Sequence, residues 1–218
     1  MAEISLSFDN GPNPEATPRV LDSLARRGIL ATFFLVCRNL DDPAARAAAE
    51  ATHAAGHWIG NHTMTHDVPL GIDPDPEAPQ REIAAAQEKL GRLAHPERFF
   101  RPFAKGELGP RLLSQAAVDH LCRGGYTCVL WTHVPGDFED HDGWPERAMA
   151  QIAEAEAAGR GHQLIVLHDA VPPAMRHLDA FLDRLAAAGH GFRQDHPPDC
   201  VPIRRGQIIG SLEGLVAG

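Results

Sequence analysis

The chain has 218 residues, of which 44% are hydrophobic, and a net charge of −9. This length and composition predict one soluble domain over residues 1–218 with a sizeable core. The acidic balance argues against a nucleic-acid partner, because duplex binding relies on clustered lysine and arginine. No stretch approaches the roughly 18 to 20 apolar residues that a bilayer span requires, so we expect no membrane partner.

Short apolar segments alternate with longer amphipathic ones, which is typical of βα units around a parallel sheet. Several of the amphipathic segments carry proline near the first turn and glycine just past the end, as helices do. Strands are predicted at residues 4–8, 31–36, 57–60, 99–101, 127–131 and 163–167, with one more near 191–193. Helices are predicted at residues 14–27, 42–55, 78–93, 110–121, 145–158 and 173–188.

The two ends of the chain carry less information. Met1-Ala2-Glu3 lacks the basic and then apolar segments of a secretory signal, so a cytoplasmic location is expected. The four cysteines form no Cys-x-x-Cys pair and are too sparse for a disulfide scaffold, which indicates reduced thiols. We expect the tail, residues 200–218, to cover the barrel bottom or to pack on a second subunit. The sequence leaves a homo-oligomer open, because proteins of this size are often symmetric.

Polar residues with chemical potential follow several of the predicted strands. Because an α/β barrel collects its chemistry at the carboxyl ends of its strands, we expect these side chains to meet in one cleft. They are Asp9, His62, Arg101, Asp137 and His168.

The histidine pair His62 and His66 is the best candidate for a metal site. With 13 histidines in the chain, about one pair at a spacing of four arises by chance, and His53 and His57 are such a pair. A single helical turn after Gly60-Asn61 would aim the two later imidazoles the same way, and imidazoles suit zinc and its neighbours. Two surface histidines remain the alternative at this point.

Each of the other candidates also has a structural explanation. Asp-Asn-Gly-Pro at residues 9–12 is a strong turn signal by itself. His168 could be a loop histidine whose hydrogen bonds are satisfied, Arg101 a surface charge, and Trp131 a core residue. The joint occurrence of these residues in this order favours a site.

Taken in order, the segments resemble the five motifs of the polysaccharide deacetylase family, the NodB-homology domains of carbohydrate esterase family four. The family's second strand is also similar to residues 31–36. The resemblance spans residues 5–169 and implies an irregular (β/α) barrel of seven or eight strands in one domain. The matching segments are Ser7-Phe8-Asp9-Asn10-Gly11-Pro12, His62-Thr63-Met64-Thr65-His66, Arg101-Pro102-Phe103, Trp131 with Asp137-Phe138, and Leu167-His168.

The resemblance also implies roles for the side chains. Asp9 would be the general base, held by Arg101. His168 would protonate the leaving amine, tuned by Asp137. The pocket for substrate would be lined by Phe103, Trp131 and Leu167.

By the same resemblance, His62, His66 and Asn10 would hold a divalent metal, Zn²⁺ or Co²⁺, which makes water a nucleophile near neutral pH. Asn10 stands where the family normally places an aspartate. A neutral amide oxygen still ligates but removes one negative charge, so we expect metal binding that is weakened yet real.

The expected activity is hydrolysis of a non-peptide C–N amide bond, foremost N-deacetylation of an N-acetylated sugar or oligosaccharide. Two alternatives stay open. One is a cyclic amide hydrolase of the allantoinase type. The other is a catalytically impaired relative that binds carbohydrate, which the presence of both Asp9 and His168 disfavours.

Overall fold

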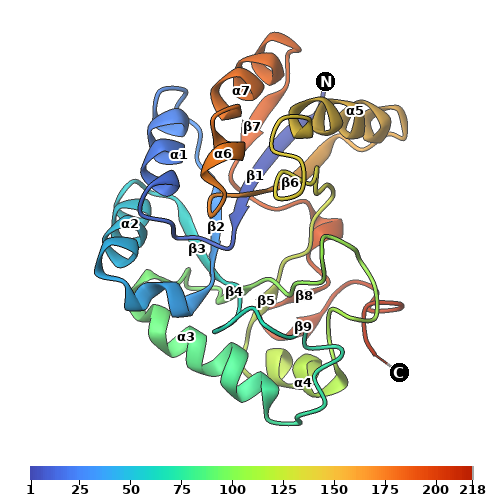
Figure 1. Ribbon diagram of the computed structural model, residues 1–218. Helices are drawn as coiled ribbons and strands as arrows, with labels where there is room; N and C mark the ends of the chain where they lie inside the picture. Colours follow the sequence, from blue (N-terminus) through green and yellow to red (C-terminus); the bar gives the residue numbers. More distant parts are fainter. Residues whose placement is uncertain (218) are drawn as a thin grey trace.

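The computed structural model describes residues 1–217, in which one curled sheet is covered on its outer side by helices (Figure 1). The strands follow the order β6-β1-β2-β3-β4-β5-β8-β9, and β7 also pairs with β1. Pairing is parallel from β6 to β5 and antiparallel for β8 and β9. The strands are β1 (Glu3–Asp9), β2 (Thr32–Leu35), β3 (Trp58–Asn61), β4 (Phe99–Phe100), β5 (Thr127–Cys128), β6 (His162–His168), β7 (Gly191–Arg193), β8 (Ile203–Arg204) and β9 (Gln207–Ile208).

The α-helices lie around the sheet, with α1, α2 and α3 beside β1 to β4 and with α5, α6 and α7 beside β6 and β7 (Figure 1). Short η turns complete the connections. The helices and turns are α1 (Ala16–Ala25), η1 (Cys37–Asp41), α2 (Pro43–Ala54), η2 (Gln80–Ala84), α3 (Ala85–Leu90), η3 (Gly91–Leu93), α4 (Gln115–Arg123), α5 (Trp144–Ala157), α6 (Pro172–Met175), α7 (Leu178–Ala187) and η4 (Pro198–Cys200).

The two faces of strand β1 have different roles: one packs in the apolar core and the other carries polar residues of the site. Successive side chains of a strand point to opposite faces, so its residues divide into two sets. Leu6 and Phe8 belong to the large apolar cluster shared with the helices. Ser7 and Asp9 lie on the other face, where both contact the buried guanidinium of Arg101. Both faces are buried, as expected for a parallel sheet covered by helices.

The barrel closes between the segment after β5 and strand β6. The Thr132 amide donates to the Leu164 carbonyl over 2.9 Å, and His133 forms a parallel bridge with Ile165. The predicted strand at residues 127–131 is therefore only partly regular, because its second half bonds to several neighbours rather than to one ladder. The Leu130 amide, for example, donates to the Cys200 carbonyl. The architecture is the irregular α/β barrel that the sequence predicts.

Three predicted helices differ from the observed ones. The helix at residues 78–93 divides into the π-helical turn η2, α3 and the 3₁₀ turn η3. The helix at 110–121 begins only at Gln115, because Leu113 pairs with the tail at Val216. The helix at 173–188 is two helices, α6 and α7.

The tail extends the sheet beyond β5 through β8 and β9. Leu212, Leu215 and Val216 then pack against the apolar cluster around α4. Among residues 1–217, no helix has the length and apolar character needed to cross a membrane.

Candidate active site

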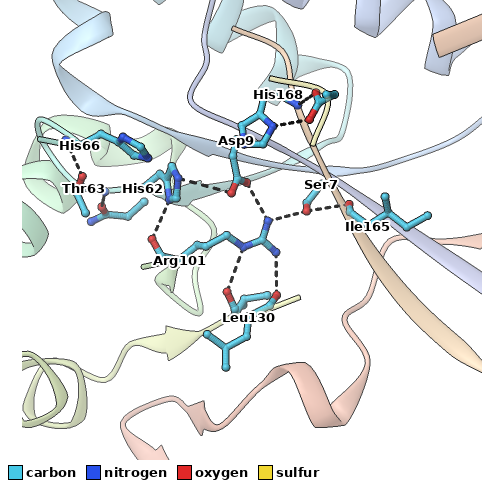
Figure 2. A network of polar contacts seen from close by, with 12 residues as sticks. Ser7, Asp9, His62, Thr63, His66, Arg101, Leu130, Ile165 and His168 are labelled. Carbon is cyan, nitrogen blue, oxygen red and sulfur yellow. Dashed lines mark hydrogen bonds and ion pairs between the residues drawn. The ribbon is translucent and has the colours of Figure 1, made fainter. Parts of the chain in front are cut away.

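The carboxyl ends of β1, β3, β4 and β6 bring the predicted residues to one cavity of about 340 Å³. Asp9, Asn10, His62, His66 and His168 line it. Figure 2 shows Asp9 between the imidazole of His62 and the guanidinium of Arg101, with His168 beside it. The volume lies at the lower end of the range for small-molecule sites.

The side chain of Arg101 is fully buried and fixes the position of Asp9. Its Nη1 lies 2.8 Å from the Asp9 Oδ1 and donates to the Ser7 hydroxyl over 2.6 Å. Its Nε and Nη2 donate to the carbonyls of Val129 and Leu130, each over 3.1 Å. The arginine therefore joins β1 to the segment after β5, and the second carboxylate oxygen of Asp9 stays free to face the cavity.

An aromatic ring supports the same guanidinium from the interior of the barrel. The Cζ of Arg101 lies 4.0 Å from the ring centroid of Phe34. Phe34 is the register partner of Gly60 on β3, and a Cβ at Gly60 would lie 2.5 Å from the ring. Glycine is required at this position because the ring takes the space that any side chain would need.

The segment that carries His62 and His66 is not the helical turn that the spacing predicts. Thr63 and His66 have positive φ angles of 72° and 61°, which a right-handed helix does not allow. The turn is held instead by side chains, since Asn61 Oδ1 accepts the Thr63 amide and Glu82 accepts the Thr65 amide, both over 2.9 Å. The imidazoles still come together, with ring centroids 4.9 Å apart.

The protonation of His62 follows from its neighbours. Its Nδ1 donates to the Arg101 carbonyl over 2.9 Å, which leaves Nε2 as the basic nitrogen, 3.6 Å from the Asp9 Oδ2. Burial lowers the pKa of both His62 and His66 to about 3, so both are neutral at ordinary pH. The ring of His66 also stacks on Phe103, with centroids 3.7 Å apart.

These histidines and Asn10 fit a divalent metal. Among residues 1–217, no three His, Cys, Asp or Glu side chains gather as a ligand set. Asn10, however, lines the same cavity, has a φ of 69°, and buries a side-chain oxygen that has no hydrogen-bond partner. A buried acceptor of this kind is costly unless something binds it. A histidine that donates its other N–H to a backbone carbonyl, as His62 does, has the arrangement typical of metal ligands.

His168 and Asp137 form the second pair that the sequence predicts. Asp137 accepts the His168 backbone amide over 2.8 Å and lies 2.7 Å from the Nδ1 of its ring. Burial lowers the pKa of His168, but the hydrogen bond and charge of Asp137, with the charges of Asp9 and Asp169, outweigh it, and the pKa is raised. These neighbours favour the protonated ring, which is the form that can donate a proton.

Aromatic and aliphatic side chains form the walls of the cavity. Phe103 and Trp131 line it, as expected, and so do Val134, Phe138 and Val166. The expectation for Leu167 is wrong. Side chains alternate along β6, so Val166 faces the cavity while Leu167 packs in the apolar layer under the helices.

Two polar residues of the site received no role from the sequence. Ser7 could have been found, because it stands two positions before Asp9 and strand alternation places both on one face. Asp169 is fully buried, and its carboxylate accepts the hydroxyl of Thr17. Its Oδ1 has no hydrogen-bond partner and would lie 2.2 Å from a Cβ at Gly11. The sequence held no signal for this packing.

Comparisons with known proteins place the chain in one family. The family model described as polysaccharide deacetylase matches residues 2–117. A chitooligosaccharide deacetylase from Rhizobium leguminosarum bv. trifolii is 34% identical over 174 residues, covering 78% of this chain and 73% of the relative.

Solved structures give the same fold. The polysaccharide deacetylase Bc1974 from Bacillus cereus has a TM-score of 0.72 at 23% identity, covering 90% of this chain and 93% of that chain. A family 4 acetyl xylan esterase from Clostridium thermocellum, solved with a cobalt ion, has a TM-score of 0.68 at 25% identity, covering 88% of this chain and 87% of that chain. The chain thus belongs to the polysaccharide deacetylase family of hydrolases, whose named deacetylases act on carbon–nitrogen bonds other than peptide bonds.

Proposed function

We propose that this protein removes the acetyl group from an N-acetylated sugar or oligosaccharide in a metal-dependent reaction. The observation that supports it is the placement of a carboxylate, Asp9, and of an imidazole, His168, whose protonated form Asp137 favours, on one cavity with apolar walls. Amide hydrolysis needs a general base and a general acid, and the two side chains have different partners, Arg101 for Asp9 and Asp137 for His168. Family members named as chitooligosaccharide deacetylases support the substrate class.

In the proposed reaction, water adds to the acetyl carbonyl and the C–N bond breaks. Asp9 accepts a proton from the attacking water through the oxygen that Arg101 does not bind. His168 donates its Nε2 proton to the leaving nitrogen, and Asp137 holds the imidazolium through Nδ1. The products are acetate and the free amine of the sugar.

His62, His66 and the side-chain oxygen of Asn10 would hold the divalent cation. When bound, such an ion polarises the acyl carbonyl and lowers the pKa of water. Neutral imidazoles suit this role, and burial keeps both histidines unprotonated.

Acetate release from an N-acetylated chitooligosaccharide, with added Zn²⁺ or Co²⁺, tests the proposal. We expect activity in the wild type and its loss in His168→Ala and Asp9→Asn. His53→Ala is the matched control, because His53 is exposed on α2, away from the cavity. Wild-type protein that releases no acetate while opening the ring of a cyclic amide would favour the alternative hydrolase. Sugar binding without either product would indicate the impaired relative.

A further inference from the structure

Two basic side chains on the rim of the cavity have no part in the chemistry above. Lys105 and Arg111 both line the cavity and both are exposed. Within residues 1–217, neither forms an ion pair with a carboxylate. Most other arginines of the chain do, as expected for a protein with an excess of acidic residues.

Among the residues that line the cavity, two carboxylates balance two cations, whereas the whole protein has a net charge of −9. Two carboxylates line the cavity near these cations, and both are compensated. Asp9 pairs with Arg101, and Asp67 pairs with Arg38, each over 2.8 Å. The positive charges on the rim remain uncompensated in a chain of net charge −9. Cations that no neighbouring carboxylate pairs with attract anions and raise their concentration at the mouth of the site.

The backbone that carries the two cations is held in place. Lys105 has a positive φ of 49°, which costs free energy in a non-glycine residue, and the indole of Trp131 donates to the Gly106 carbonyl over 3.2 Å. The Arg111 carbonyl accepts the amide of Gly71, where a Cβ would lie 2.3 Å from the Pro110 carbonyl. The loop is thus a fixed support for these side chains.

Unusual backbone angles concentrate around the same cavity. Among residues 1–217, six non-glycine residues have positive φ. Three of them, Asn10, His66 and Lys105, line the cavity. Strained residues of this kind cluster at ligand-binding positions, where the surrounding structure has to hold them. Lys105 therefore shares the backbone character of the candidate metal ligands, although it lies on a different loop.

We propose that Lys105 and Arg111 form a subsite for an anionic group, a carboxylate or a phosphate, carried by the N-acetylated sugar that is deacetylated. This inference rests on the proposed function and narrows its substrate class. The apolar walls contact the acetyl group and the sugar ring, while the two cations bind the charged substituent on the outer side. Arginine pairs with carboxylate and with phosphate in a two-point contact, and lysine adds a point charge.

The test compares three substrates by acetate release: N-acetylmuramic acid, which carries a carboxylate, N-acetylglucosamine 6-phosphate, and neutral triacetylchitotriose. The readout is the ratio of kcat/KM for each anionic substrate to that for the neutral one. We expect a ratio well above one for at least one anionic sugar. The larger of the two ratios shows whether the subsite prefers a carboxylate or a phosphate. Raising NaCl from 50 to 500 mM should reduce the ratio, because salt screens exposed charges.

The variant Lys105→Gln/Arg111→Gln should lower this ratio by about tenfold or more, since hydrogen bonds to charged groups contribute at least that much selectivity. Arg123→Gln is the matched control, because Arg123 is an exposed arginine at the end of α4 that does not line the cavity. A wild type that deacetylates all three sugars at similar kcat/KM, with no change in the double variant, overturns the subsite and leaves the deacetylase proposal intact. No acetate from any substrate overturns the proposed function, and the subsite with it.

Discussion

Replacing Asp169 by asparagine should change the stability of the protein in a way that depends on pH. The free energy of unfolding of the variant, relative to that of the wild type, should be higher at alkaline pH than at acidic pH. Asp169 is fully buried beneath the loop of Gly11, and the Thr17 hydroxyl donates to its carboxylate. Burial raises the pKa of Asp169 to about 7 from 3.8, and the charge of Asp9 adds to the effect. The folded protein therefore holds this proton more tightly than the unfolded chain does.

The sign of the pH dependence follows from that difference. Between pH 3.8 and about 7 the folded state is protonated at Asp169 and the unfolded state is not, so stability falls as pH rises through this window. Well inside the window each pH unit corresponds to about 1.4 kcal/mol, which gives roughly 2 kcal/mol between pH 5 and 7 and about a few tenths of a kcal/mol more between pH 7 and 8. Asparagine, of nearly the same shape, does not titrate.

Urea denaturation of both proteins at pH 5, 6, 7 and 8 measures this contribution. The free energy of unfolding of the variant minus that of the wild type should rise by about 2 kcal/mol from pH 5 to 7 and level off near pH 8. Other titrating groups cancel in the difference. Asp22→Asn, at an exposed position of α1, is the matched control for the substitution itself. A flat line for Asp169→Asn would show that its pKa is not raised.

Four further outcomes test the site and the fold. Arg101→Met should lower the free energy of unfolding by about 3–5 kcal/mol in urea, because Asp9 stays buried without its cation; a loss below 1 kcal/mol would contradict the described ion pair. His168→Ala should lower kcat by about 10²- to 10⁴-fold, and Asp137→Asn should shift the alkaline limb of the kcat profile to lower pH, since Asp137 raises the pKa of His168. Asn10→Asp should raise the Zn²⁺ or Co²⁺ content per chain, measured by elemental analysis of protein purified without chelator; equal and negligible content in both proteins would reject the metal site. Burial lowers the pKa of His57 to about 4 and that of His196 to about 3. The two neutral imidazoles therefore contribute fully to the free energy of unfolding above pH 6.5, and this contribution is lost as pH falls, by about 3 kcal/mol for His57 alone at pH 4. A urea midpoint that stays constant from pH 7 to 4.5 in the Asp169→Asn background would contradict this.

The parts of the site that the sequence predicts are those at strand ends. A buried parallel strand can be recognised in the sequence as an apolar segment. The polar residue at its carboxyl end then lies at the rim of the barrel. Asp9, Arg101 and His168 were found in this way. His62 and His66 were found by spacing, although the expected helical turn was wrong, because Asn61 and Glu82 hold a tighter turn that no local pattern shows.

The parts that the sequence did not predict depend on contacts between distant segments. The pairing of Leu113 with the tail shortens the helix predicted at 110–121. The face of Leu167 was misassigned because the motif match ignored strand alternation, which would have pointed to Val166. The rim position of Lys105 depends on a loop that Trp131 holds from another strand end. The domain boundaries, the cellular location and the oligomeric state stay predictions.

The five donors of the Arg101 guanidinium have a bearing on how relatives of this protein should be compared. Three of its contacts go to Ser7 and to the carbonyls after β5, so the barrel needs this arginine whether or not any reaction takes place. A homologue that had lost its catalytic activity would keep this arginine because the barrel structure depends on it. The presence of arginine at this position is therefore poor evidence of catalysis. Asp137, which contacts the imidazole of His168, is the better residue to compare.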